Sequence, residues 1–320
     1  MRVSYDELFE TLCRILLKKG FDDEDAALCA RLFTETTRDG VYTHGVSRFP
    51  RFLRTIENGS VDIHARPELT EALGSLERWS GNRGPGNLNA HRSMARAVEL
   101  ATGNGTGCVA LAGTNHWMRG GSYGWQAADA GMIGICWTNT LPNLPPWGSD
   151  KPKLGNNPLV IAAPRAGGHV VLDMAMSQFS FGALERYGRS GEPLPVDGGY
   201  DREGNLTRDA AAIDETGRVL PVGFWKGAGL ALVLDIIAAG LSGGLATHQI
   251  PANPEFETGI SQVFLAIKPV DTDIADRIIE NLRSEDGVRY PGERTLALRK
   301  ENMEKGIPVD PGVWDEVGKL

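Results

Sequence analysis

Apolar and polar positions near the N-terminus alternate with helical periodicity. A capping-box pattern at Ser4 and Glu7 opens an apolar repeat that Gly20 closes. A second repeat of the same spacing covers residues 22–40, and a third helix is predicted over 47–59. The chain is therefore predicted to begin with three consecutive helices.

Short apolar runs replace these repeats in the middle of the chain. Residues 108–112 and 133–137 have the length typical of buried strands, and each is adjacent to a predicted helix, over 87–103 and 122–131. Because strands alternate with helices here, we expect the two strands to pair in parallel within an α/β fold.

The second half of the chain combines further strands with one strongly apolar helix. Strands are expected over 159–163 and 169–175, which a two-glycine turn joins, and over 259–267. Residues 226–240 form the most apolar segment. This segment contains Asp235 and is too short to span a bilayer, so we expect a buried helix. Weaker helical patterns cover 178–188, 271–283 and the polar C-terminal tail.

Charge and cysteine content narrow the class of protein. The chain has 320 residues, enough for two domains or one large one, and its 41 acidic and 33 basic residues give a net charge of −8. This balance argues against a nucleic-acid-binding protein, which needs a basic surface. The four cysteines form no C-x-x-C pair and are expected to be free thiols. The first residues do not resemble a signal peptide, so a cytoplasmic location is expected.

The signatures of the common nucleotide-binding folds are missing from the sequence. Gly103, Gly105 and Gly107 lie between a predicted helix and a predicted strand, whereas the dinucleotide fingerprint lies between a strand and a helix. No P-loop pattern occurs either. A nicotinamide cofactor would therefore require a fold other than a Rossmann domain.

Two of the six histidines differ from the others in their surroundings. His44 and His116 lie in glycine-containing loops beside polar residues, and Arg48 follows His44 by one helical turn. A histidine can protonate a developing alkoxide, and an arginine can hold a carboxylate through two hydrogen bonds. The same spacing is also compatible with a helix-capping histidine and an exposed arginine. The histidines show no metal-binding spacing, so no metal site is predicted.

Five motifs together resemble those of a known enzyme family. They are Thr43-His44-Gly45-Val46-Ser47-Arg48, Asn115-His116-Trp117, Leu154-Gly155-Asn156-Asn157-Pro158, Leu172-Asp173-Met174-Ala175-Met176-Ser177 and Tyr290-Pro291-Gly292-Glu293. The sequence resembles the type-2 malate/L-lactate dehydrogenases, which are NAD(P)-dependent 2-oxoacid reductases unrelated to Rossmann enzymes. The resemblance extends over nearly the whole chain.

This resemblance implies an α/β fold with a large mixed, non-Rossmann sheet flanked by helices. It implies a helical region of residues 1–60 that carries the catalytic histidine, and an NAD(P)-binding mixed-sheet domain of residues 61–285. The C-terminal segment, 286–320, is expected to return to the helical region. The resemblance also implies a cytoplasmic homodimer whose cofactor site lies near the subunit interface.

The resemblance implies roles for individual residues as well. His44 is the implied proton donor, Arg48 is expected to bind the substrate carboxylate, and His116 is expected to orient the carbonyl or to serve as the donor instead. The implied cofactor contacts are Thr140, His169, Val170, Val171, Leu172, Asp173, Met174, Ala175, Trp225, Lys226, Gly292, Glu293 and Arg294.

NADH is the expected cofactor and NADPH is the alternative. Arg294 could bind a 2′-phosphate, whereas Asp173 beside a ribose would disfavour one. Lys226 opens the apolar helix, where its ammonium and the backbone N–H groups could bind a phosphate of the cofactor. The sequence alone leaves the choice between the two cofactors open.

The expected activity is hydride transfer from NAD(P)H to a small anionic, sugar-derived 2-oxoacid. Malate, lactate, ureidoglycolate and cyclic imino acids are alternative substrates, because substrate choice depends on the shape of the pocket. A sugar-acid-binding protein without catalysis is the alternative from another functional class. A second copy of the chain is an expected partner, whereas nucleic acid and membrane are not.

Overall fold

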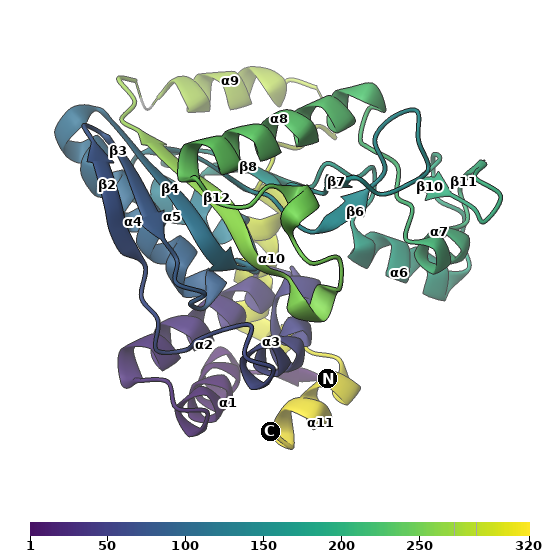
Figure 1. The fold of residues 1–320 in the computed structure, drawn as a ribbon, viewed down its shortest axis with the longest axis horizontal. Coiled ribbons are helices and arrows are strands. Elements are labelled where there is room, and N and C mark those ends of the chain that lie inside the picture. Colours follow the sequence, from purple (N-terminus) through teal and green to yellow (C-terminus); the bar gives the residue numbers. More distant parts are fainter. Residues whose placement is uncertain (272, 286) are drawn as a thin grey trace.

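A seven-stranded mixed sheet forms the centre of the molecule (Figure 1). The computed structural model describes residues 1–271, 273–285 and 287–320. In order across the sheet, the strands are β2 (Glu68–Leu73), β3 (Leu76–Ser80), β4 (Thr106–Asn115), β12 (Thr258–Ile267), β5 (Ile133–Thr138), β8 (Leu159–Ala163) and β9 (Val170–Met174). The β3–β4 pair is parallel and the other neighbouring pairs are antiparallel. The expected large mixed sheet is confirmed.

The prediction that strands 108–112 and 133–137 pair in parallel is wrong. These residues lie in β4 and β5, but β12 lies between the two strands and is antiparallel to both. Consecutive strands are usually neighbours in a sheet, and the local pattern carries no sign of a strand that arrives from far along the chain. The positions of the two strands were predictable, whereas their pairing was not.

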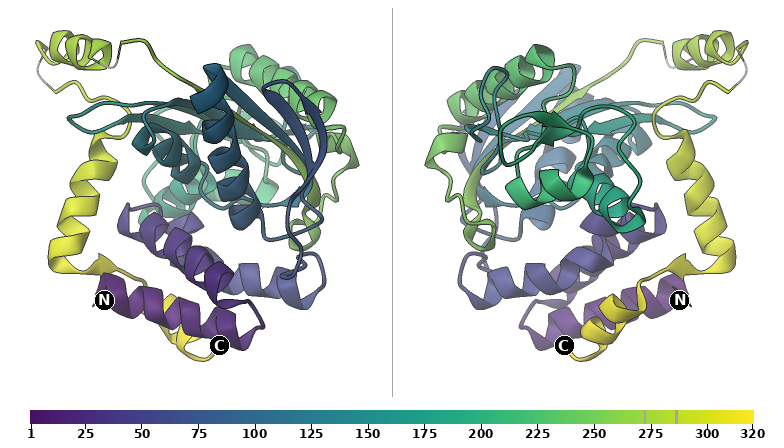
Figure 2. Two further views of the ribbon diagram at one scale, coloured as in Figure 1. Left: turned by 90° about the vertical axis from the view of Figure 1, so that its left-hand side faces the viewer. Right: turned by 90° about the vertical axis from the view of Figure 1, so that its right-hand side faces the viewer.

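Helices cover both faces of the sheet (Figure 2). On β12, Phe264 belongs to the apolar cluster of α4 (Gly86–Asn104) and α5 (Gly121–Asp129), whereas Val263 belongs to the cluster of α8 (Trp225–Ser242). Adjacent side chains of a strand point to opposite faces of the sheet. Therefore α4 and α5 cover one face and α8 covers the other.

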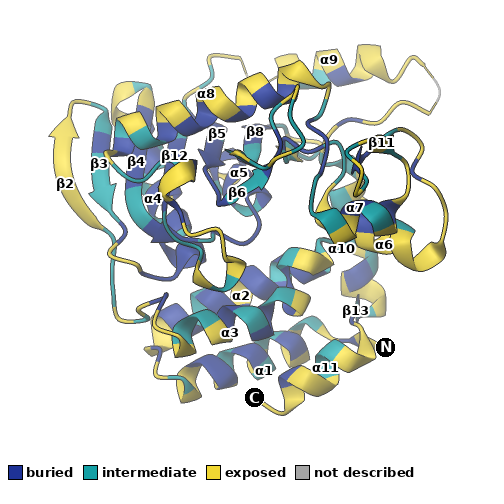
Figure 3. Cartoon of the chain, turned by 45° about the vertical axis from the view of Figure 1, so that its right-hand side comes forward, coloured by how far each residue is buried: buried dark blue, intermediate teal, exposed yellow. Residues whose placement is uncertain are grey.

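Helix α8 is longer and more exposed than the sequence predicted. Only 39% of its residues are buried, and Val233 and Ile236 are among those exposed. Much of α8 carries the colour of exposed residues in Figure 3. By length and composition alone α8 could cross a membrane. Its inner face, however, packs on the sheet and carries the buried Asp235, which accepts hydrogen bonds from Asn139 Nδ2 and the N–H of Thr247. The expectation of a buried helix holds for the inner face of α8 and is wrong for its outer face, because the sheet covers one side of the helix only.

The N-terminal helices and the C-terminal segment form one helical region below the sheet (Figures 1 and 2). Its helices are α1 (Tyr5–Lys18), α2 (Asp23–Arg38), α3 (Phe49–Glu57) and α11 (Pro311–Gly318). Ser4 caps α1 by accepting the N–H of Glu7, as predicted. Strand β1 (Arg2–Val3) pairs with β13 (Ile307–Pro308), and α10 (Glu293–Lys305) connects this region to the sheet. The helical region built from both termini is therefore confirmed.

The remaining elements are short and lie mainly in connections. They are η1 (Tyr42–His44), η2 (Val46–Arg48), β6 (Pro142–Leu144), β7 (Leu154–Gly155), α6 (Phe181–Ser190), β10 (Gly199–Tyr200), β11 (Leu206–Thr207), α7 (Ala210–Thr216), η3 (Thr247–Gln249), η4 (Pro254–Phe256) and α9 (Ile274–Leu282). Helix α9 lies away from the sheet and the other helices (Figure 2). The four cysteines are free, as expected.

Candidate active site

The turn after α2 positions His44 and Arg48. Two short 3₁₀ turns, η1 and η2, carry these residues on either side of Gly45. The N–H of Val46 donates to the hydroxyl of Thr37 in α2 at 2.9 Å, and a side chain at Gly45 would collide with that threonine. The glycine therefore lets the turn pack closely against α2 and fixes where His44 and Arg48 lie.

The loop after β4 positions His116. Met118 adopts the left-handed conformation (φ 64°), and its N–H donates to Nδ1 of His116 at 3.0 Å. Because Nδ1 is an acceptor, the neutral imidazole carries its hydrogen on Nε2. The loop thus presents His116 as a hydrogen-bond donor.

The two histidines predicted from the sequence lie together. Their rings are stacked, with 5.8 Å between centroids and 21° between planes. Nδ1 of His44 is 3.1 Å from the hydroxyl of Thr43, and this pair comes from a segment remote in sequence from His116. The structure thus brings the turn after α2 and the loop after β4 to one place.

Both histidines are neutral near pH 7 in the free protein. Burial, followed by the positive charges of Arg48 and Arg119, lowers the pKa of His44 to about 4. Burial also holds the pKa of His116 well below its usual value, with further contributions from Arg48, His44 and Arg51. An anion bound at Arg48 would offset one of these charges and raise both pKa values.

A narrow cavity opens beside His116. It is lined by Arg48, Arg51, Phe52, Thr55, Val61, Gly86, Asn115, His116, Met118, Pro254 and Glu257. Arg51 is held by the carbonyl of Pro254 at 2.6 Å and by Glu255 at 3.5 Å. The guanidinium of Arg48 has no hydrogen-bond or ion-pair partner among the residues that the structure describes. Burial lowers its pKa to about 10, so it stays charged at neutral pH.

Besides Arg51, sequence reasoning missed a second charged group in this cavity, Glu257. It lies just before β12, and its Oε1 accepts the N–H of Leu141 at 3.1 Å. Burial raises the pKa of Glu257. The hydrogen bond from the Leu141 N–H and the charges of Arg48 and Arg51 act in the opposite direction, but the net shift is upward. No local pattern marks this residue, because β12 reaches the site only through its non-local pairing with β4 and β5.

The predicted cofactor segments meet along β9, the edge strand of the sheet. At the start of β9 the N–H of Val171 donates to the carbonyl of Pro291 at 2.9 Å. Gly292 has a φ of 98°, and a Cβ there would lie 3.1 Å from both the carbonyl of His169 and the N–H of Val171. Residues 290–294 therefore pack directly on the first half of the strand, and only glycine fits this approach without strain.

The start of α8 lies beyond the other end of β9. The N–H of Val222 donates to the carbonyl of Met176 at 2.8 Å, and α8 begins three residues later with the exposed pair Trp225 and Lys226. Phe224, just before the helix, has a φ of 59°. The three predicted cofactor segments therefore follow one another along a single strand.

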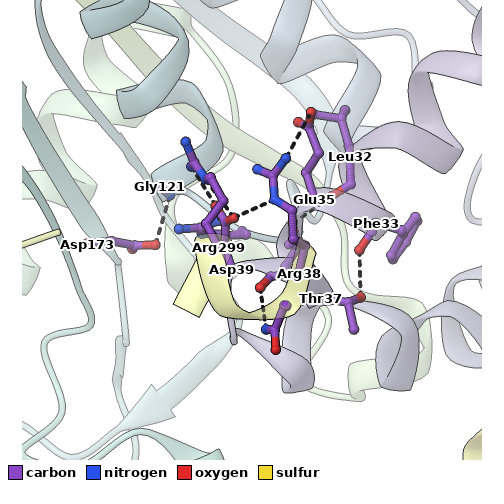
Figure 4. Close-up of polar contacts among 12 residues, drawn as sticks. Leu32, Phe33, Glu35, Thr37, Arg38, Asp39, Gly121, Asp173 and Arg299 are labelled. Carbon is purple, nitrogen blue, oxygen red and sulfur yellow. Dashed lines mark hydrogen bonds and ion pairs between the residues drawn. The ribbon is translucent and has the colours of Figure 1, made fainter. Parts of the chain in front are cut away.

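A side-chain contact links this strand to the loop of His116 (Figure 4). Oδ2 of Asp173 in β9 accepts the N–H of Gly121, at the start of α5, at 2.8 Å. A Cβ at Gly182 in α6 would lie 2.6 Å from the side chain of Thr43, so the turn of His44 also packs near the chain that leaves β9. The candidate catalytic and cofactor segments are thus contiguous.

Several predicted cofactor residues have contacts within the protein. The Thr140 hydroxyl is buried and accepts the N–H of Asn156 at 3.0 Å. His169 lies between Asp129 and the N–H of Arg165, Glu293 pairs with Arg283, and Arg294 is exposed; these contacts show how each side chain is placed. The roles assigned to these residues stay predictions.

An ion cluster that the sequence did not reveal holds the surroundings of the site together (Figure 4). Asp39 at the end of α2 accepts hydrogen bonds from Arg119, Arg38 and Arg299 at 2.7 to 2.9 Å. Burial disfavours the charge of Asp39, but the hydrogen bond from Arg299 and the charges of Arg119 and Arg38 lower its pKa to about 2. The cluster fixes α2, the loop of His116 and α10 relative to one another. Within the described part of the chain no group of three His, Cys, Asp or Glu side chains could hold a metal ion.

Comparison with known proteins identifies the family. A family model for malate/L-lactate dehydrogenases matches residues 3–318. The chain belongs to the malate/L-lactate dehydrogenase family. Among its relatives, the 2,3-diketo-L-gulonate reductases of Citrobacter koseri and Escherichia coli are each 45% identical, with all of both chains covered.

Solved structures of this malate/L-lactate dehydrogenase family share the fold. The sulfolactate dehydrogenase of Methanocaldococcus jannaschii has a TM-score of 0.92 at 26% identity, over 100% of this chain and 96% of that one. The Δ1-piperideine-2-carboxylate reductase of Pseudomonas syringae has a TM-score of 0.91 at 27% identity, over 100% and 99%. The family resemblance of the sequence is therefore confirmed. The protein is an oxidoreductase that uses a nicotinamide cofactor and a small organic acid.

Proposed function

We propose that the protein reduces a sugar-derived 2-oxoacid with NAD(P)H, and that the reaction is the reduction of 2,3-diketo-L-gulonate to 3-dehydro-L-gulonate. The observation that carries this proposal is that Arg48, which has no partner among the described residues, lines one cavity with His116, whose ring stacks on that of His44. Relatives that are 45% identical over the whole chain and are named 2,3-diketo-L-gulonate reductase support the choice of substrate.

Arg48 binds the carboxylate of the substrate. Arg48 is half-buried, and its guanidinium is charged and without a partner among the described residues, so an anion gains two hydrogen bonds without displacing an existing ion pair. Nε2–H of His116 donates to the reacting carbonyl oxygen and orients it. The bound carboxylate also raises the pKa of His44, so that His44 can take up a proton when the substrate binds.

His44 then gives this proton to the oxygen as the carbonyl is reduced. The nicotinamide supplies the hydride to the keto carbon when the cofactor is bound. The proton from His44 neutralises the alkoxide that would otherwise form in a cavity with limited access for water. The product leaves as the 2-hydroxyacid anion, and His44 returns to its neutral form. His116 is the alternative proton donor.

The face of β9 provides a cradle for the dinucleotide. The strand has five residues and spans about 17 Å. Peptide groups of residues 169–175 and 292–294 line one part of it, and Lys226 lies at the other end, at the start of α8, where it can meet a phosphate. We assign NADH as the preferred cofactor, because the Asp173 carboxylate on this strand disfavours a 2′-phosphate. NADPH is the alternative, with Arg294 as its phosphate ligand.

The direct test is the loss of NADH absorbance when 2,3-diketo-L-gulonate is added. The same assay with NADPH, and with the 2-oxoacids or imines that correspond to malate, lactate, ureidoglycolate and cyclic imino acids, ranks the alternatives. The highest kcat/KM is expected with 2,3-diketo-L-gulonate and NADH. If none of these compounds is reduced, the proposal is wrong.

We also propose that the protein is a cytoplasmic homodimer. The outer face of α8 exposes a row of large apolar side chains, and a contiguous apolar surface of this kind usually marks an interface. The row consists of Leu230, Leu232, Val233, Ile236 and Ile237. Helix α9 exposes Ile274, Ile278 and Leu282 in addition. A second copy that covers α8 explains these surfaces without a membrane or a nucleic acid as partner.

A further inference from the structure

The cavity beside His116 contains two hydrogen-bond acceptors that the proposed reaction does not use. The first is Asn115, which is almost completely buried. Its Nδ2 donates to the carbonyls of Arg83 and Gly84 at 2.7 and 3.0 Å, and these bonds fix the orientation of the amide. Oδ1 is consequently an acceptor, and it is buried without a partner among the described residues.

The second acceptor is the carboxylate of Glu257. One oxygen accepts the N–H of Leu141, and the other has no hydrogen-bond partner in the described part of the chain. Arg51 is bound to Pro254 and Glu255, and no ion pair joins Glu257 to either Arg48 or Arg51. Glu257 is partly buried and lines the cavity, so its free oxygen can accept a hydrogen bond from a ligand that supplies a donor.

We propose that Glu257 and Asn115 bind hydroxyl groups of the substrate, so that the site selects 2-oxoacids with one carboxylate and a hydroxylated chain and excludes dicarboxylates. This inference rests on the proposed function and specifies its substrate class. Arg48 binds the one carboxylate, and Glu257 meets the chain beyond the keto carbon. A second carboxylate at that position would lie next to the carboxylate of Glu257.

The charges in the cavity support this division of roles. Arg51 is already paired with Glu255, so Arg48 and Glu257 are the charges left to the ligand. A monoanion satisfies Arg48 and leaves Glu257 for a donor. A dianion would place two negative groups together in a partly buried space, which costs binding energy and excludes the wrong substrate. Sites that hydrogen-bond a substrate hydroxyl also reject analogues that lack it.

Glu257 could instead act only by keeping Arg48 in place. Substitution of Glu257 would then lower kcat/KM for every 2-oxoacid to the same extent, because Arg48 binds the carboxylate of all of them. If Glu257 instead binds the part of the substrate beyond the keto carbon, its substitution would affect each substrate according to the group that the substrate carries there. Three substrates separate the two roles: 2,3-diketo-L-gulonate has distal hydroxyls, oxaloacetate has a distal carboxylate, and pyruvate has neither.

The experiment compares kcat/KM of the full-length wild type and Glu257→Gln for these three substrates with NADH. Glutamine keeps an oxygen for the Leu141 N–H and removes the charge. We expect kcat/KM to fall about 10-fold or more for 2,3-diketo-L-gulonate, to rise several-fold for oxaloacetate, and to stay within about twofold for pyruvate. Glu10→Gln is the matched control, because Glu10 is exposed on α1 and does not line the cavity, and it should leave the ratios unchanged.

Unchanged melting temperature and unchanged NADH quenching of tryptophan fluorescence establish that the variant is folded. An equal fall for all three substrates would show that Glu257 only positions Arg48 and would overturn the inference. Unchanged ratios would overturn it as well. If the wild type reduces 2,3-diketo-L-gulonate but the ratios do not respond to Glu257→Gln, the proposed function survives and the inference fails. If it reduces no 2-oxoacid, both fail.

Discussion

His44 and His116 are neighbours, but their contacts differ, and this difference predicts different consequences of substitution. Among the described residues, His44 hydrogen-bonds to Thr43 only and otherwise stacks on His116, so His44→Ala should leave the melting temperature and the NADH affinity nearly unchanged. Because His44 is the proposed general acid, its loss should lower kcat about 10² to 10⁴-fold, or about 3–5 kcal/mol of barrier. Steady-state kinetics and a thermal melt of the same preparation test this prediction. A variant that keeps its turnover would transfer the donor role to His116.

His116→Ala should affect stability as well as catalysis. Nδ1 of His116 accepts the N–H of Met118, which lies in a strained left-handed conformation, and the substitution leaves that N–H without its acceptor. We expect a loss of about 1–3 kcal/mol in the free energy of unfolding, measured by urea denaturation. His116→Asn, which can keep an acceptor near that N–H, is the control and should recover part of the loss. Equal stability of wild type and His116→Ala would contradict this reading of the loop.

The low pKa of His44 predicts a separation between two pH profiles. The pKa of about 4 applies to the free protein, so kcat/KM for reduction should decline as pH rises above about 4, because the protonated fraction of His44 shrinks. The profile of kcat reports the complex, in which the substrate carboxylate offsets the charge of Arg48. Its decline should therefore begin at a higher pH. In Arg48→Ala, KM should rise strongly for carboxylate substrates. The pH profiles of kcat and kcat/KM should then coincide, because the charge that separates them is gone. Coincident profiles in the wild type would argue against this coupling.

Among the secondary-structure elements, β9 and the glycine that packs on it make the cofactor site testable. Gly292→Ala introduces a Cβ 3.1 Å from backbone atoms of His169 and Val171 at a φ of 98°. We expect a weaker Kd for NADH, by about 5-fold or more, and a loss of about 1–3 kcal/mol in stability. Gly191→Ala is a matched control, because Gly191 has a φ of 70° and no neighbour within 4 Å of the added Cβ. It should lose stability but bind NADH normally, whereas equal NADH affinity of both variants would place the cofactor elsewhere.

The elements also show what the sequence could and could not predict. Helices α1 and α2 carry their caps, periodicity and end signals in the sequence, and strands β8 and β9 form around an evident glycine turn, so all four were predictable. The insertion of β12 between β4 and β5 was not, because strand pairing depends on the whole sheet. For the same reason the sequence predicted His44, Arg48 and His116 through local motifs, but not Glu257 or the Asp39 cluster. Those groups reach the site only through long-range packing.

In the whole molecule, the exposed apolar face of α8 predicts the oligomeric state. Ile236 is 60% exposed at the middle of this face, and a dimer that buries it should separate when a charge is introduced there. Ile236→Lys is expected to halve the mass measured by light scattering after size exclusion. Val196→Lys, at a 49% exposed site away from α8, is the control and should remain dimeric. A monomeric wild type would contradict the proposed homodimer.

The central position of β12 has a consequence for how the chain is made. Without β12, strands β2, β3 and β4 form one partial sheet and β5, β8 and β9 form another, each with an open edge. Residues up to 267 of 320 must therefore be synthesised and leave the ribosome before the sheet can be completed. Until then the nascent protein presents two unpaired strand edges, the kind of surface that recruits chaperones or aggregates. A chain that stops short of Thr258 lacks the central strand of its sheet, so translation of the last fifth decides whether the molecule folds at all.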